Sequence, residues 1–125
     1  MGIDYTSSAA YGLVITDEYR ERVIDLAVEL GYDLGEYGRE EIDYWDAVES
    51  VAEKFDLKCF TAGDSYSGET EHLIGEGVTN WQFGWTRVEP VSTTLADTAV
   101  LKLQRLRLAL DMHEEPAWYA GLHVW

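Results

Sequence analysis

The fold class is decided by residues 57–78, which read LKCFTAGDSYSGETEHLIGEGV. Residues 57–62 and 70–78 have the composition and patterning of β-strands. Between them, residues 63–69 are rich in Gly, Ser and Asp, which favour turns. Two strands joined by such a segment predict a β-hairpin, and therefore a sheet with antiparallel pairing.

Working outward toward the N-terminus, the sequence predicts one strand and two helices. Residues 8–15 alternate between two faces, as a strand does. Residues 17–30 have helical spacing, and Thr16 stands where an N-cap belongs. Residues 39–55 predict a second helix, whose apolar positions recur every three or four residues: Ile42, Trp45, Val48, Ala52 and Phe55.

On the C-terminal side, residues 80–88 predict an extended segment and residues 117–125 a last strand. Between them, residues 95–112 predict a third helix, and Thr94 and Asp97 resemble its capping box. Its main apolar stripe consists of Leu95, Ala99, Leu103, Leu106 and Leu110.

The length and the order of elements predict a single α+β domain over residues 1–125. A chain of strands and helices in this order favours a mainly antiparallel sheet with about three helices packed on one face. The single cysteine, Cys59, excludes an intrachain disulfide and fits a reducing compartment. We therefore expect a cytoplasmic protein.

Acidic residues are in large excess, and they are unevenly distributed. The chain has 24 Asp and Glu against 9 Lys and Arg, a formal charge of -15. The first 80 residues hold 19 acids and 5 bases, whereas the last 45 hold 5 acids and 4 bases. This charge repels nucleic acid and anionic membranes, and no apolar run is long enough to span a bilayer. The expected partners are basic proteins, or cations.

The predicted second helix carries a row of carboxylates beside its apolar stripe. Like charges at three- or four-residue spacing destabilise a helix by a few tenths of a kcal/mol per pair, so partner binding is one reason for such a row to be kept. A regular row of carboxylates could imitate nucleic-acid phosphates and occupy a basic groove. The alternative is an ordinary solvated face that keeps the protein in solution. The residues expected to contact a partner are Glu40, Glu41, Asp43, Asp46, Glu49, Glu53 and Asp56.

Two apolar features suggest a surface for self-association. The aromatic residues Trp81, Phe83 and Trp85 alternate with smaller or polar residues, so their rings would share one face of a strand. The predicted third helix has a second apolar stripe, made of Leu101, Leu108 and Met112. Both features could equally belong to the core. The same helix carries three bases that could meet the acidic region of another copy in a homodimer, or pair within the chain: Lys102, Arg105 and Arg107.

No residue set forms a recognisable catalytic, metal or cofactor site. A turn near Tyr66 would place Cys59 and His72 on one face of the sheet. Two ligands fall short of the four that a structural zinc site uses. No phosphate-binding glycine loop or nucleophile elbow is present, so we expect no enzyme activity and no cofactor.

The opening Met-Gly-Ile-Asp-Tyr-Thr, the short strand at residues 11–15 and the glycine-bounded turn at residues 62–68 resemble small acidic proteins encoded by bacteriophages. This resemblance implies a context and no individual site residue. Phages use small acidic proteins to inhibit host enzymes and defence systems, among them anti-CRISPR proteins and DNA mimics.

Charge and resemblance together favour a non-catalytic binding protein that blocks a basic, nucleic-acid-binding protein inside a bacterial host. An immunity protein against a basic nuclease toxin would use the same physical principle. The alternative from another class is a structural or self-assembling phage subunit.

Overall fold

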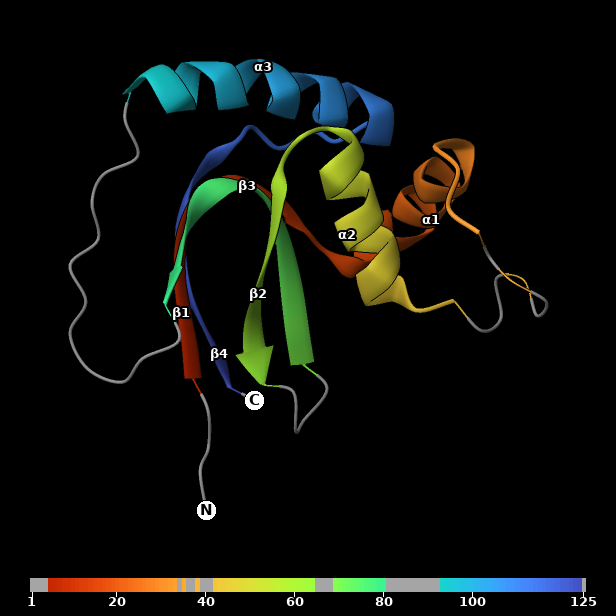
Figure 1. Ribbon diagram of the computed structural model, residues 1–125, viewed down its shortest axis with the longest axis horizontal. Coiled ribbons are helices and arrows are strands. Elements are labelled where there is room, and N and C mark those ends of the chain that lie inside the picture. The colour runs from red at the N-terminus through yellow and green to blue at the C-terminus, as the bar shows by residue number, and fades with distance from the viewer. Residues whose placement is uncertain are drawn as a thin grey trace.

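The computed structural model describes residues 5–33, 35, 38, 42–64, 69–80 and 93–124. The described residues form four strands, which surround a common axis, and three α-helices, which pack around the outside of the strands (Figure 1). The elements, in chain order, are β1 (Tyr5–Ile15), the 3-10 helix η1 (Asp17–Tyr19), α1 (Arg20–Glu29), α2 (Tyr44–Lys54), β2 (Lys58–Asp64), β3 (Glu69–Asn80), α3 (Thr93–Leu110) and β4 (Ala117–Val124). The predicted α+β fold class is confirmed.

The four strands form a small closed barrel in the order β1-β3-β2-β4. The predicted hairpin is present, because β2 pairs antiparallel with β3. Strand β1 pairs antiparallel with both β3 and β4. A short parallel contact between β2 and β4 closes the barrel, with Gly63 opposite His123 and Asp64 opposite Val124. The sheet is thus mainly antiparallel, as expected, and its closure is an added feature.

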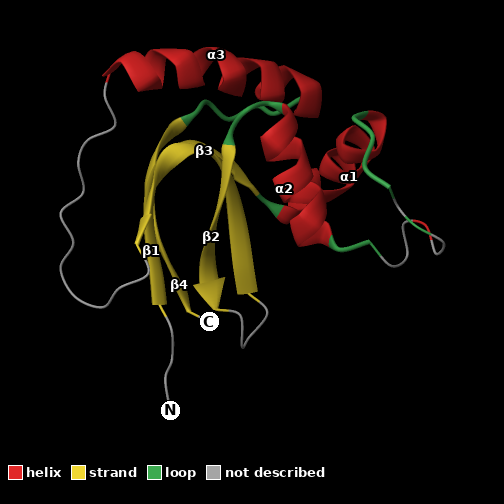
Figure 2. Ribbon diagram, viewed as in Figure 1, coloured by secondary structure: helices red, strands yellow, loops and turns green. Residues whose placement is uncertain are grey.

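The main core lies between the barrel and the helices. Figure 2 shows α3 across one end of the strands and α1 and α2 along their side. Side chains of the sheet such as Leu13 and Ile74 pack against apolar residues of all three helices. Full burial of one such side chain contributes about 1.5–3 kcal/mol. The helices bury Val23, Leu26, Ala27, Ala47, Val48, Val51, Ala52, Ala99, Leu103, Leu106 and Leu110 in this cluster.

The opposite face of the sheet is lined by a smaller cluster and by glycines. Ala10, Phe60 and Leu73 form this second cluster. Gly12 lies opposite Gly75 in the β1–β3 pair. A Cβ on Gly12 would stand 2.3 Å from the carbonyl oxygen of Ile74, so the two strands approach too closely for any side chain there. Such close approach allows a barrel of only four strands to close, since its interior has little volume.

Several predicted helix boundaries were wrong by a few residues. The first helix begins as η1, and the Thr16 side chain makes no capping hydrogen bond. The second helix begins at Tyr44 instead of residue 39. The third runs over Thr93–Leu110, so it starts before the expected Thr94 cap and ends before Met112. The extended segment expected at residues 80–88 lies outside the described residues, apart from Asn80 at the end of β3.

Asp43 fixes the beginning of α2. Its carboxylate accepts a hydrogen bond from the backbone N–H of Asp46 at 3.3 Å, which satisfies one of the free donors of the first turn. We expect Asp43→Ala to lower the free energy of unfolding by about 1 kcal/mol, measured by urea denaturation. Asp43→Asn keeps a capping oxygen and should leave stability almost unchanged. Equal losses in both variants would contradict the capping role.

Candidate partner-binding surface

The carboxylate row of α2 is present on the surface. Asp46, Glu49 and Glu53 are exposed and follow one another at intervals of three and four residues, so they share one side of the helix. The rest of the predicted set is arranged differently. Asp43 is the N-cap and Asp56 lies beyond the helix end, where its φ is +57°. Glu40 and Glu41 lie outside the described residues.

The carboxylates predicted to contact a partner differ in whether they already bind other side chains of this protein. Lys102 of α3 forms an ion pair with Asp56 at 2.7 Å. The hydrogen bond and the positive charge of Lys102 lower the pKa of the Asp56 carboxyl. Glu49 accepts a hydrogen bond from the Trp45 indole N–H at 2.9 Å. Among the described residues, the carboxylates of Asp46 and Glu53 have no such contact, so they are the most available to a partner.

A shallow groove of about 410 Å³ runs between α2 and β2 beside this row. Carboxylates and apolar surface line it together, because α2 contributes Glu49, Ala52 and Glu53 while the chain after it contributes Leu57 and Phe60. A lysine or arginine side chain could lay its alkyl stem on the apolar part and direct its charge to the carboxylates. The remaining lining residues are Asp56, Lys58 and Cys59.

Cys59 offers no nucleophile to this groove. Burial, followed by the negative charge of Glu49, raises the pKa of its thiol to about 12, so the thiol is protonated at neutral pH. The strand register places Cys59 and His72 on the same face of the sheet, as the sequence suggested for a turn near Tyr66. Within the part of the chain that the structure describes, no group of three or more His, Cys, Asp or Glu side chains could hold a metal ion.

A second acidic row on η1 and α1, which the sequence analysis did not identify, extends the surface. Glu18, Glu21, Asp25 and Glu29 are exposed and recur every three or four residues, which is the spacing that could have revealed them. Helix α1 packs directly against α2. Residues 17–56 contain 14 acids and 4 bases, so this segment holds -10 of the total charge of -15. The acidic surface therefore belongs to a helical pair and not to α2 alone.

The two arginines of α1 are directed at the protein's own groups. The Arg20 guanidinium lies over the Tyr44 ring, 4.5 Å from its centroid. Arg22 donates hydrogen bonds to the carbonyl oxygens of Leu110 at 3.2 Å and Asp111 at 2.9 Å, at the C-terminal end of α3. These contacts join the helices to one another and leave the carboxylates as the dominant charge on the α1 surface.

The residues proposed for self-association separate into three groups. Leu101 and Leu108 are 66% and 81% exposed and lie seven residues apart on the outer side of α3. The inclusion of Met112 was wrong, because it is 5% exposed and belongs to the main core. The chain leaves the helix after Leu110 and directs Met112 inward, which the helical spacing could not show. Trp81, Phe83 and Trp85 lie outside the described residues.

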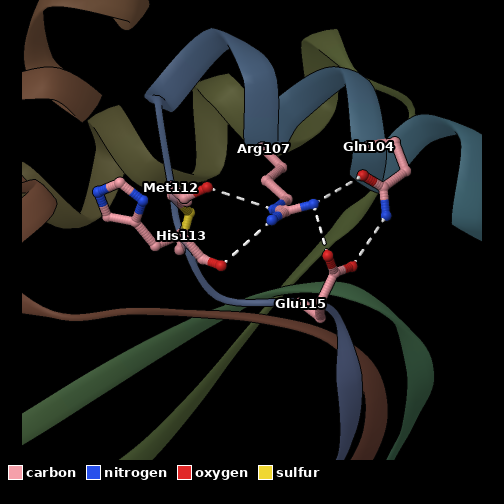
Figure 3. Close-up of polar contacts among 5 residues, drawn as sticks. All are labelled: Gln104, Arg107, Met112, His113 and Glu115. Carbon is pink, nitrogen blue, oxygen red and sulfur yellow. Dashed lines mark hydrogen bonds and ion pairs between the residues drawn. The ribbon is translucent and has the colours of Figure 1, made fainter.

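Two of the three bases of α3 pair with acids of the same chain. Lys102 binds Asp56, and Arg107 binds Glu115 at 2.8 Å. Figure 3 shows that Arg107 also reaches the turn between α3 and β4, where it donates to the carbonyl oxygens of Met112 and His113 at 3.2 and 3.1 Å. Arg107 therefore holds the end of α3 and the following turn in place, whereas Lys102 joins α3 to the chain just after α2. Pairing within the chain was the alternative to pairing between copies.

No protein-family model, curated protein or solved structure matches the chain. No helix within the described ranges is long and apolar enough to cross a membrane.

Proposed function

We propose that this chain is a non-catalytic binding protein that occupies a basic surface of a nucleic-acid-binding protein. The observation that carries the proposal is the row of exposed carboxylates on α2, Asp46, Glu49 and Glu53, beside a groove with apolar lining. The target would be a host or defence protein in the bacterial cytoplasm, as for a phage inhibitor of the anti-CRISPR or DNA-mimic type. An immunity protein would present the same surface to a basic nuclease.

The mechanism is competition for the nucleic-acid site. The acidic helical pair would attract a basic groove over a long range and speed association, and added salt would weaken that attraction. At contact, arginine side chains of the target would form paired hydrogen bonds with carboxylates, as they do with phosphates. The bound protein would then exclude the nucleic acid sterically and by charge repulsion.

The test reverses the charges of the row. The triple variant Asp46→Lys, Glu49→Lys and Glu53→Lys should lose at least about tenfold in capture of DNA-binding proteins from a bacterial lysate, because each contact would become repulsive. A control variant changes net charge equally at exposed acids outside the helical pair, by reversing Glu71, Asp111 and Glu114 to lysine, and should retain capture. Capture by the wild-type protein should fall between about 50 and 200 mM salt and on addition of duplex DNA.

Two results would contradict this proposal. The first is equal capture by the triple variant and the wild-type protein. The second is equal loss in both triple variants, which would indicate that net charge alone, and not the α2 surface, governs binding. Circular dichroism of each variant checks that the fold is retained.

A self-assembling subunit is the second candidate, and the exposed Leu101 and Leu108 favour it. Two large apolar side chains on one side of a helix are a common feature of helix–helix interfaces. Light scattering separates the two functions. A large ring or filament that dissociates in a Leu101→Ser, Leu108→Ser variant supports assembly, whereas a monodisperse monomer or dimer supports the inhibitor.

A further inference from the structure

Two buried histidines from different strands contact one tryptophan. His72 of β3 and His123 of β4 are 5% and 1% exposed. The ring of Trp45, in the first turn of α2, lies 5.1 Å from the ring of His72 and 5.7 Å from that of His123. One indole therefore joins two strands to the N-terminal end of α2. We call His72, His123 and Trp45 the His–Trp joint.

The His–Trp joint lies where the barrel closes. His123 stands opposite Gly63 in the parallel contact between β2 and β4, which comprises two residue pairs in the described part of the chain. Tyr44, the first residue of α2, also contacts the His72 ring, at 5.8 Å. The joint therefore holds two features at once, the closure of the barrel and the docking of α2 on it.

The surroundings of His72 disfavour a charged imidazole. Its Nδ1 lies 3.4 Å from the Thr61 hydroxyl, a neutral partner. Burial lowers the pKa of His72 below its usual value, and the nearby His123 lowers it further. Burial also raises the pKa of Tyr44 to about 12, so this neighbour stays neutral. The other titratable or charged groups around the joint are Asp17 of η1, Arg20 of α1, Glu49 of α2 and Cys59 of β2.

Among these groups, only Asp17 and Glu49 could favour an imidazolium. Glu49 already accepts the hydrogen bond of the Trp45 indole, and it is exposed to solvent, which screens its charge. Arg20 opposes protonation because its charge has the same sign. No carboxylate within the described ranges forms an ion pair with His72.

We infer that the His–Trp joint is an acid-sensitive latch, in which proton uptake by His72 releases α2 and the end of β4 from the barrel. A histidine that is harder to protonate in the closed state takes up its proton more easily once the joint opens to water. The closed state is therefore fully favoured above about pH 6.5, the usual value for histidine. As the pH falls below that value, proton uptake by His72 raises the equilibrium constant for opening by up to about tenfold per pH unit.

Hydrogen exchange of backbone amides tests this inference on the whole chain. Between about pH 7 and pH 5.5, and after correction for intrinsic exchange rates, protection of α2 and of residues 121–124 should fall about tenfold in the wild-type protein. Carboxylates have usual pKa values near 4, so they contribute little to this interval. His72→Gln should remove most of the pH dependence. His113→Gln is the matched control, because His113 is exposed, and it should behave as the wild-type protein does.

Three outcomes would overturn the latch. One is constant protection in the wild-type protein across this interval, and another is an unchanged pH dependence in His72→Gln. Should His72→Gln fail to fold, NMR titration of the His72 ring in the wild-type protein decides the matter. A titration midpoint at or above the usual histidine value in the closed state would exclude the latch.

Discussion

Gly75→Ala is expected to lower the free energy of unfolding by at least about 3 kcal/mol, because the new methyl group has no space. A Cβ at this position would lie 2.1 Å from the carbonyl oxygen of Tyr11 and 2.7 Å from the Cα of Gly12. Both atoms belong to the backbone of β1, so relief requires the β1–β3 pair to separate. Domains of this size have stabilities of about 5–15 kcal/mol, so the change removes between about a fifth and more than half of the total.

Gly35→Ala is the matched control for this change. Gly35 has a φ of +72°, and within the described part of the chain no atom lies within 4 Å of its would-be Cβ, so alanine meets strain in the backbone without a collision there. The expected cost is about 1 kcal/mol. Urea denaturation followed by circular dichroism measures both variants. A loss at Gly75 no larger than that at Gly35 would show that the strands do not approach this closely.

Leu106→Ala should lower the free energy of unfolding by about 2–5 kcal/mol, the second large effect. Leu106 is 0% exposed and lies in the main core between α3 and the barrel. The substitution removes apolar contacts and leaves a cavity, because the backbones of the helix and the sheet cannot both relax into it.

Leu108→Ala provides the comparison within the same helix. Leu108 is 81% exposed, so its truncation removes few contacts and should change stability by no more than about 0.5 kcal/mol. Both variants replace leucine by alanine in the C-terminal part of α3, only two residues apart, so differences in helix propensity largely cancel. Similar losses in the two variants would mean that α3 is not packed on the barrel through the Leu106 side.

Much of the local structure followed from the sequence. The hairpin was recognised from its turn-forming residues, and it appears as β2 and β3. The stripe that includes Leu103, Leu106 and Leu110 is buried as its spacing predicted. These features depend on neighbours within a few residues, and short-range periodicity records that information directly.

The start of α2 was misplaced for a physical reason. The polar residues from position 39 are compatible with a helix, so the sequence alone allows several starting points. The Asp43 side chain acts as the N-cap, and the helix therefore begins at Tyr44. Ala47 and Val51 are also buried on α2 although they lay outside the predicted stripe. Helix α2 contacts both α1 and the sheet, so it buries a wider surface than one partner would require.

The acidic surface was predicted in part. The exposed positions of Asp46, Glu49 and Glu53 followed from helical spacing, since residues beside a buried stripe face solvent. The ion pair of Asp56 with Lys102 joins residues 46 positions apart, so no local pattern could reveal it. The acidic row of α1 has helical spacing, which was visible in the sequence. That it extends the acidic surface of α2 follows only from the packing of α1 against α2.

The sequence by itself determined the fold class, the elements and the strong negative charge of residues 17–56, because these depend on composition and short-range periodicity. Only the tertiary structure decided how the barrel closes, that Met112 is buried, and that His72 and His123 contact the same indole. Each of these depends on residues distant in the chain that meet only after the strands have paired. At Gly12 and Gly75, strands β1 and β3 pair at a distance that leaves no space for a side chain, and glycine is the residue that allows two strands to come so close.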